Sequence, residues 1–232
     1  DFIHYRHSDA AAKGIGVTQD SFQVVLGNYG YDDETFPKKE WIVTECNLPR
    51  KQFDNFIGSD AAQRNFMTKA VVTCMQRDIH QLHLYKLADD TEEQKATFEF
   101  DLMGMYKKLD VDDGYFQQKN DAAIAYATAT ELLFEHTAKD ENLHEYFNNE
   151  NIDGGKFINE YGTVTYVLWA KTDTDQSEAA IATINFPADS EVVSVIRREW
   201  DYSSNFKSHL IDSNSIELTG EPSYFTISNF TS

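Results

Sequence analysis

Long apolar segments are missing from this 232-residue sequence, and positive charge is scarce. No run approaches the roughly 18–20 apolar residues that a membrane-spanning helix needs, so we expect no membrane partner. Lysine and arginine number 20 against 39 aspartate and glutamate residues, which gives a formal net charge of −19 at pH 7. Because this charge would repel nucleic acids and anionic membranes, the composition argues against a nucleic-acid partner as well.

Cysteine is rare too. Only Cys46 and Cys74 occur, and neither belongs to a CxxC motif or to a cysteine–histidine spacing typical of a metal site. Free cysteine is usually buried, so we expect two buried thiols, one on a strand and one on a helix. A disulfide between them is the alternative.

The remaining composition is that of a core-forming protein. Hydrophobic residues make up 41 % and aromatic residues 13 %, which excludes a disordered acidic tail. The length permits one large domain or two modest ones. The sequence changes character near residue 140, from alternating strand and helix patterns to a pattern rich in strands alone.

The first part alternates short apolar runs with helical periodicity. Thr18 and Ser59 stand where helix N-caps are expected, and Gly30 stands where a helix should end. Such alternation predicts βαβ units with parallel strands. The expected strands cover residues 1–5, 41–45 and 79–85, and the expected helices cover residues 18–29, 59–77 and 121–135.

The second part predicts an antiparallel β-sandwich, because short alternating strands follow one another at close spacing. Turn-forming clusters at residues 153–155 and 173–175 separate the runs. The expected strands cover residues 163–169, 179–186, 191–196, 215–218 and 224–227.

The most informative motif is residues 41–49, Trp-Ile-Val-Thr-Glu-Cys-Asn-Leu-Pro. It places Glu45 where a strand ends and a loop begins, which is where α/β barrels carry catalytic groups. Many strands end in glutamate, so the motif gains weight only from the order of the elements around it.

That order resembles the end of a clan-A glycoside hydrolase barrel, the (β/α)₈ retaining enzymes that include xylosidase- and iduronidase-like families. The resemblance implies an α/β region, residues 1–138, that forms the last three βα units of a TIM barrel. An all-β sandwich would follow at residues 139–232. The matching segments are 1–5 for the sixth strand, 42–47 for the seventh, 80–89 for the eighth, 100–106 before the last helix, and 166–170 with 220–224 in the sandwich.

The resemblance implies retaining hydrolysis of O-glycosidic bonds in poly- or oligosaccharides. This chemistry uses two carboxylates roughly 5–5.5 Å apart. Glu45 matches the nucleophile, whereas the acid/base would lie on a fourth strand before Asp1 and is missing from this chain. The resemblance implies no metal and no organic cofactor, and it implies an extracellular or periplasmic location.

Further site residues follow from the same resemblance. His4 or His7, near the sixth strand, would hold the nucleophile or a sugar hydroxyl. Asn47 would orient the carboxylate or bind the sugar. Tyr85 and Asp89 would line the sugar site, since an aromatic ring and a carboxylate suit a polyol with one apolar face. The family often carries tryptophan where this sequence has Tyr85.

A full barrel takes about 250 residues, and about 135 precede the expected sandwich. The rest must come from another chain, an upstream region that has been removed, or a second copy, because three units leave an open edge and an apolar face. We expect the isolated chain to be inactive.

The rival hypothesis is a non-catalytic module that binds a glycan or a protein through aromatic residues such as Trp169 or Trp200, although Trp169 fits a core position better. A third hypothesis is that the chain is an unrelated acidic α+β protein whose motifs match by chance.

Overall fold

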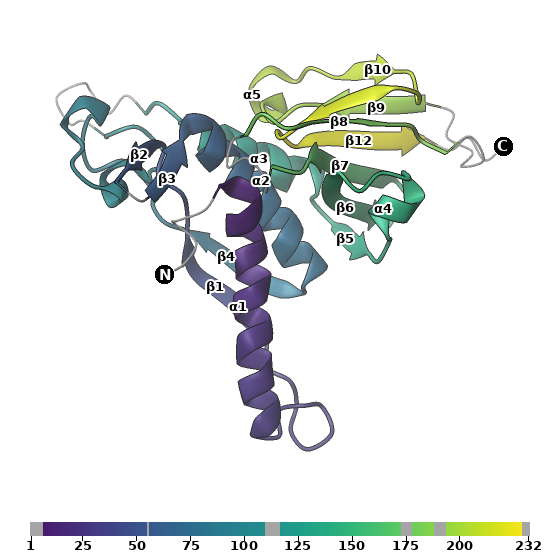
Figure 1. Cartoon of the computed structure of the whole chain (residues 1–232), viewed down its shortest axis with the longest axis horizontal. Helices are drawn as coiled ribbons and strands as arrows, with labels where there is room; N and C mark the ends of the chain where they lie inside the picture. The colour runs from purple at the N-terminus through teal and green to yellow at the C-terminus, as the bar shows by residue number, and fades with distance from the viewer. Residues whose placement is uncertain (1–6, 55, 110–116, 173–177, 188–193, 229–232) are drawn as a thin grey trace.

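The computed structural model describes residues 7–54, 56–109, 117–172, 178–187 and 194–228. The chain folds into a region of helices with a small parallel sheet, followed by a region of antiparallel strands (residues 136–228), which we call the C-terminal β region (Figure 1). The strand expected at residues 1–5, with His4, lies outside the described residues. Among those described, no helix has the length and hydropathy needed to cross a membrane.

The small sheet consists of β1 (Trp41–Cys46) and β4 (Ile79–Leu84), which pair in parallel. Val43 pairs with Leu82 and Cys46 with Leu84, so β1 contains one extra residue between these pairs. Both strands and their parallel pairing confirm the sequence prediction. A hairpin of β2 (Lys51–Phe53) and β3 (Phe56–Ser59), which was not predicted, follows β1.

Helices α1 (Ser8–Asn28), α2 (Asp60–Gln76) and α3 (Asp121–Leu132) pack beside this sheet. The start of α2 agrees with the prediction, because the Ser59 side chain accepts a hydrogen bond from Ala62 N at 3.0 Å. The predicted start of α1 at Thr18 is wrong. The helix begins at Ser8, since alanine favours helix and the first turns are buried against the core. Gly30, at φ +83°, follows its end.

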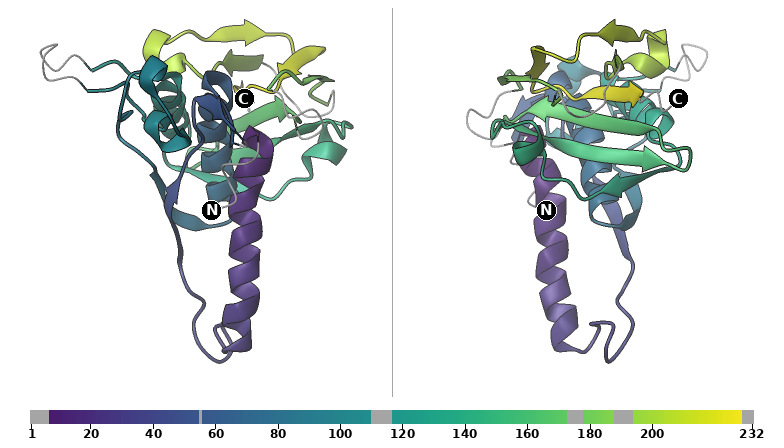
Figure 2. Two further views of the ribbon diagram at one scale, coloured as in Figure 1. Left: turned by 60° about the vertical axis from the view of Figure 1, so that its left-hand side comes forward. Right: turned by 90° about the vertical axis from the view of Figure 1, so that its right-hand side faces the viewer.

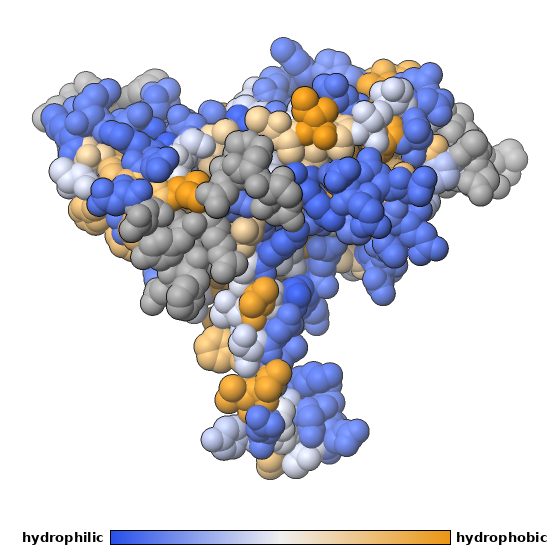
Figure 3. Space-filling view, in the orientation of Figure 1, coloured by the Kyte–Doolittle hydropathy of each residue, from blue (hydrophilic) through white to orange (hydrophobic). Residues whose placement is uncertain are grey.

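The second half of α1 projects beyond the rest of the molecule (Figures 1 and 2). Apolar side chains are exposed along it, among them Val17, Val24 and Val25, and apolar surface follows this helix in the space-filling view (Figure 3). The shorter helical segments are η2 (Glu93–Lys95), η3 (Glu99–Leu102), α4 (Leu143–Tyr146) and α5 (Tyr202–Asn205).

The C-terminal β region contains a six-stranded antiparallel sheet in the order β10-β9-β12-β7-β6-β5 and a two-stranded sheet of β8 and β11. A hydrophobic cluster that includes Tyr166, Leu168, Ile184, Leu218 and Phe225 joins the two sheets. The sheet begins at His136, before the expected domain boundary at residue 139. The strands are β5 (His136–Lys139), β6 (Ile152–Asn159), β7 (Val164–Ala170), β8 (Ile181–Ile184), β9 (Ser194–Arg198), β10 (His209–Ile211), β11 (Ile216–Thr219) and β12 (Ser223–Ser228).

Residues 153–155 do not form the predicted turn, because they lie inside β6. Gly154 has φ +147°, and a Cβ atom at this position would lie 2.0 Å from the carbonyl oxygen of Val167 on β7. Here glycine permits a close approach of two strands, which the sequence pattern alone cannot distinguish from a turn. The turn predicted at residues 173–175 lies outside the described residues.

Helix α2 is buried between the two regions. Phe66, Met67 and Ala70 belong to a cluster that includes α1 and the inner side of β1 and β4. Val72 belongs to a second cluster, with Trp169 and other residues of the six-stranded sheet. Because α2 is covered on both sides, it is the element through which the parallel sheet and the C-terminal β region are joined (Figure 2).

A buried lysine strengthens this junction. Lys69 of α2 has no exposed side-chain surface, and its Nζ lies 2.5 Å from Asp9 Oδ1, 2.8 Å from Ser8 Oγ and 3.7 Å from Glu178 Oε2. Thr172 N donates to Asp9 Oδ2 at 2.6 Å. Burial alone would raise the pKa of Asp9, but Lys69 and the Thr172 amide outweigh burial and hold this pKa below its ordinary value.

Replacing Lys69 by methionine should lower the free energy of unfolding by about 3–5 kcal/mol, because Asp9 would stay fully buried without its cation. Urea denaturation measures this change. Lys95→Met is the matched control. The Lys95 ammonium forms an ion pair with the exposed Glu92 at 2.9 Å, and loss of this pair should cost less than about 1 kcal/mol. Equal losses in the two variants would contradict a stabilising role for the buried cluster.

Candidate functional site

The two faces of the parallel sheet differ in burial. Val43 and Cys46 of β1 pack with the helices, whereas Ile42 is 52 % exposed. On β4, Gln81 and His83 are exposed as well. The face of the sheet away from the helices is therefore open to solvent, and it carries polar side chains next to an unusually exposed isoleucine.

Glu45 lies at the carboxyl end of β1, beside the buried Cys46, and it is exposed. Within the described part of the chain, its carboxylate takes part in no hydrogen bond or ion pair. Tyr85 N donates to Cys46 O at 3.0 Å, so the ends of β1 and β4 lie side by side. The arrangement presents an available carboxylate at the edge of the sheet where two parallel strands end.

Asn47 follows directly, but it is buried rather than available to a ligand. Its Nδ2 donates to the carbonyl oxygens of Tyr85 and Met103, the latter at 2.6 Å, and its Oδ1 accepts from Leu48 N at 2.7 Å. The amide group is thus used entirely by backbone groups. The predicted role in contacting the carboxylate or the sugar is replaced by a role in holding together the loops that follow β1 and β4.

Asp89 is also placed differently from the prediction. Its side chain has no exposed surface, and Arg50 Nε and Nη2 both lie 2.9 Å from its Oδ2. Gly104 N donates to Oδ1 at 2.8 Å. Asn120, which precedes α3, donates from Nδ2 to Gly104 O at 2.9 Å. A carboxylate enclosed in this way does not line an open site, and its contacts with Arg50 and Gly104 join the loops instead.

Sequence reasoning missed the partner of Asp89. Arg50 is 7 % exposed, and its outer nitrogen Nη1 reaches two exposed carboxylates, Glu93 at 3.1 Å and Asp60 at 3.4 Å. The only local signal is an arginine directly after Leu48-Pro49 at the end of the motif. That signal does not identify a partner 39 residues further along the chain.

Tyr85 keeps a position that suits ligand contact. It is half-buried in the loop after β4, and its ring meets Phe100 edge to face at a centroid distance of 5.8 Å. Phe98, which is exposed, lies 6.1 Å from Phe100. This aromatic cluster follows the strand beside Glu45 and provides an apolar surface of the kind on which a sugar ring packs.

The remaining predicted residues lie elsewhere. His7 is buried, and its Nδ1 lies 3.1 Å from Thr172 Oγ1 of the C-terminal β region, so it contributes to the junction of the two regions. Trp169 is 4 % exposed, in agreement with the core position preferred for it. Trp200 is half-buried, with the Arg64 guanidinium 4.6 Å from its ring centroid. Neither indole forms an exposed binding platform.

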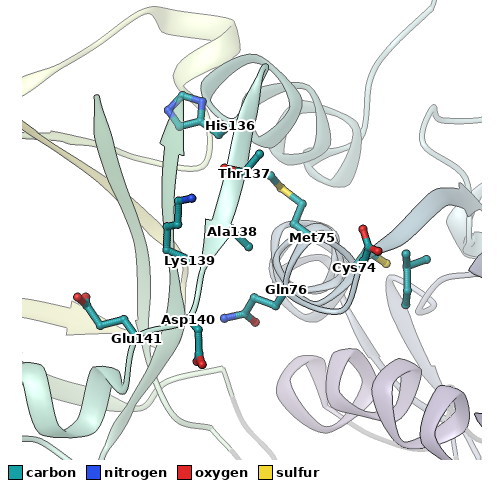
Figure 4. A pocket seen from close by; sticks show the side chains of 11 residues that line it. Cys74, Met75, Gln76, His136, Thr137, Ala138, Lys139, Asp140 and Glu141 are labelled. Atoms are coloured by element: carbon teal, nitrogen blue, oxygen red, sulfur yellow. The ribbon is translucent and has the colours of Figure 1, made fainter. Parts of the chain in front are cut away.

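Both cysteines are free and buried, Cys46 on β1 and Cys74 on α2, which confirms the preferred prediction. Burial raises the pKa of both thiols, that of Cys74 to about 12, so neither is a reactive nucleophile. Cys74 borders a cavity of about 690 Å³ between the last turn of α2 and β5 (Figure 4). Polar groups there already have partners: Glu141 pairs with Lys156 at 2.7 Å, and Gln76 Nε2 donates to Gly154 O at 2.9 Å.

No family model and no curated protein matches this sequence. Solved structures do match. A family 39 glycoside hydrolase from the gut symbiont Bacteroides cellulosilyticus WH2 aligns with 84 % of this chain and 35 % of its own, with a TM-score of 0.59 and 14 % identity. The GH51 arabinofuranosidase from Xanthomonas axonopodis pv. citri aligns with 96 % of this chain and 50 % of its own, with a TM-score of 0.50 and 10 % identity.

At these identities the likeness concerns the fold. The chain spans about a third to a half of the length of these structures, so its fold is that of a part of larger glycoside hydrolase chains. The expected relation to this class of proteins is thereby supported at the level of fold.

Replacing Asp89 by asparagine should lower the free energy of unfolding by about 3–5 kcal/mol, because Arg50 would remain buried without its principal counter-charge. Thermal or urea denaturation measures this loss. Glu93→Gln, which alters an exposed partner of the same guanidinium, should cost less than about 1 kcal/mol. A stable Asp89→Asn variant that lost only saccharide binding would instead support the predicted contact between Asp89 and the sugar.

Proposed function

We propose that this chain is the C-terminal portion of a retaining glycoside hydrolase of clan A, with Glu45 as nucleophile. In this proposal the parallel sheet and its helices are the last units of a TIM barrel, and the C-terminal β region is the sandwich that follows. The observation that carries the proposal is the exposed Glu45 carboxylate at the carboxyl end of a parallel strand, where no described residue pairs with it. That end of an α/β barrel is where catalytic groups lie.

The proposed substrate is a poly- or oligosaccharide with O-glycosidic bonds. A Glu45 oxygen attacks the anomeric carbon and the bond to the leaving oxygen breaks, which gives a covalent glycosyl-enzyme. A second carboxyl group, roughly 5–5.5 Å from the first, donates a proton to the leaving oxygen and then takes one from the water that hydrolyses the intermediate. Asp89 is enclosed by Arg50 and does not suit this second role.

In this proposal, as the resemblance implies, the acid/base belongs to a strand of the barrel that lies before this chain. The aromatic cluster of Tyr85, Phe98 and Phe100 is the proposed support for the sugar. His4, which lies outside the described residues, stays a proposed contact. Asn47 and the Arg50–Asp89 pair would act as positioning residues that hold the loops around the nucleophile. The resemblance to glycoside hydrolases, among which secretion is common for polysaccharide degradation, supports an extracellular or periplasmic location.

The missing half of the barrel is the proposed partner. A sheet of two strands is too small to be stable by itself. Its face beside Ile42 is open, and the aligned part of this chain covers only 35 % and 50 % of the two similar structures. We propose that upstream βα units pair with the free edges of the sheet and complete the site, so that the 232-residue chain is inactive when isolated.

The protein isolated from its source should accordingly have roughly twice the mass of 26.6 kDa, the size expected when the missing barrel units are added. Intact mass spectrometry with sedimentation analysis tests this expectation. A product of 26.6 kDa that sediments as a dimer would contradict an upstream half and would instead support a barrel completed by a second copy.

Glu45→Gln in the complete protein should reduce turnover of a saccharide substrate at least about a thousandfold, because the amide cannot form the covalent intermediate. Stability should be unchanged, since the side chain is exposed. Glu40→Gln, an exposed glutamate just before the start of the same strand, is the matched control and should keep full activity. Equal turnover by the two variants would contradict the proposal and favour the non-catalytic binding module.

A further inference from the structure

The open face of the parallel sheet carries a histidine to which the proposed function gives no role. His83 is exposed on β4, and its neighbours Leu82 and Leu84 pack with the helices. Because successive side chains of a strand point to opposite faces, His83 lies on the face away from the helices. Glu45, the proposed nucleophile, is exposed just before Cys46, which packs with the helices. Both side chains therefore lie on the open face.

The register of the two strands places His83 opposite Glu45. Between two consecutive pairs of aligned residues, β4 has one residue, His83, whereas β1 has two, Thr44 and Glu45. An extra residue of this kind bends its strand and re-aims a side chain, and such bulges are frequent next to active sites. Since neighbouring strands lie about 4.8 Å apart, His83 is the cross-strand neighbour of the proposed nucleophile.

A sugar that Glu45 attacks would lie partly over β4. Its anomeric carbon has to come within about 3–3.5 Å of a carboxylate oxygen. That carbon belongs to a ring with hydroxyl groups on its other atoms, and such a ring is wider than the spacing of two strands. In the described part of the chain β4 is the strand that pairs with β1, and His83 is the β4 residue exposed at this level.

The imidazole of His83 is available to a ligand. Among the described residues its hydrogen-bond partner is Gln81, which is also exposed, with His83 Nε2 3.2 Å from Gln81 Oε1. By contrast, the polar groups of Asn47 and Asp89 near this edge are buried and engaged within the fold. Because a neutral imidazole has one donor and one acceptor nitrogen, it suits a sugar hydroxyl, which also donates and accepts.

We propose that His83 is a substrate-contacting residue, which forms a hydrogen bond with a hydroxyl group of the sugar unit that Glu45 attacks, while Gln81 holds the imidazole ring. The role of His83 rests on the proposed function, whereas its position beside Glu45 rests on the register of the two strands. The contact would orient the anomeric carbon towards the carboxylate.

The first test compares variants of the complete protein on 4-nitrophenyl glycosides of mono- and disaccharides built from xylose, arabinose and glucose. His83→Ala should lower kcat/KM at least about tenfold, because a hydrogen bond to the substrate is lost. His83→Gln, which keeps a donor and an acceptor, should restore kcat/KM to within about threefold of the wild type.

His80→Ala is the matched control. His80 is an exposed histidine on the same strand, three residues before His83. At about 3.3 Å per residue it lies about 10 Å from His83, so its loss should leave kcat/KM unchanged. Equal kcat/KM of His83→Ala, His80→Ala and wild type would overturn the proposal.

A second test separates a sugar contact from a structural effect of the substitution. It uses analogues of the best substrate that each lack one hydroxyl group. In the wild type, loss of the contacted hydroxyl should lower kcat/KM about tenfold. In His83→Ala, the same analogue should be cleaved as fast as its parent, since the partner of that hydroxyl is already gone. If every analogue loses the same factor in both proteins, the imidazole contacts no hydroxyl and the proposal is overturned.

Glu45→Gln distinguishes this inference from the proposed function. If Glu45→Gln loses turnover while the His83 variants keep the wild-type kcat/KM, the contact is overturned and the proposed hydrolase stands. If Glu45→Gln keeps turnover, or if the complete protein cleaves no substrate of the panel, the proposed function fails and the contact fails with it. Loss of turnover in Glu45→Gln together with the hydroxyl-dependent loss in His83→Ala supports both.

Discussion

The architecture depends on one buried ion cluster, in which the Lys69 ammonium is shared by Ser8, Asp9 and Glu178. Removing a charge from water is costly unless counter-charges surround it, so the cluster forms only when α1, α2 and the C-terminal β region meet in one geometry. Helix α2 then holds the parallel sheet on one side and the six-stranded sheet on the other. The cluster therefore connects parts that are far apart in the sequence.

A second buried network acts at the ends of the parallel strands. Arg50 with Asp89, and Asn47 with two backbone carbonyls, fasten the loops that follow β1 and β4. These polar side chains are engaged in contacts within the fold and are not available to a ligand. Among the described residues at this edge, Glu45 is exposed and pairs with no cation, unlike Asp60 and Glu93, which contact Arg50. Chemistry is therefore assigned to Glu45 and sugar contact to the aromatic cluster beside Tyr85.

The proposed active site lies near the start of α2, where Asp60 contacts Arg50 in the loop after β1. In the proposal its acid/base comes from outside this chain. That requirement is in keeping with a fold that matches part of larger glycoside hydrolase chains.

The sequence by itself determined the elements whose signals are local: β1, β4 and α2, with Ser59 capping the helix, follow from periodicity and capping chemistry. Tertiary structure decided what depends on distant partners. The first turns of α1 are helical because they pack on the core, and Gly154 serves a strand rather than a turn because β7 lies against it. Asp89 is a buried anchor rather than a ligand contact because Arg50 reaches it from another loop. Which residues are buried depends on which segments pack together, and local sequence patterns do not specify that packing.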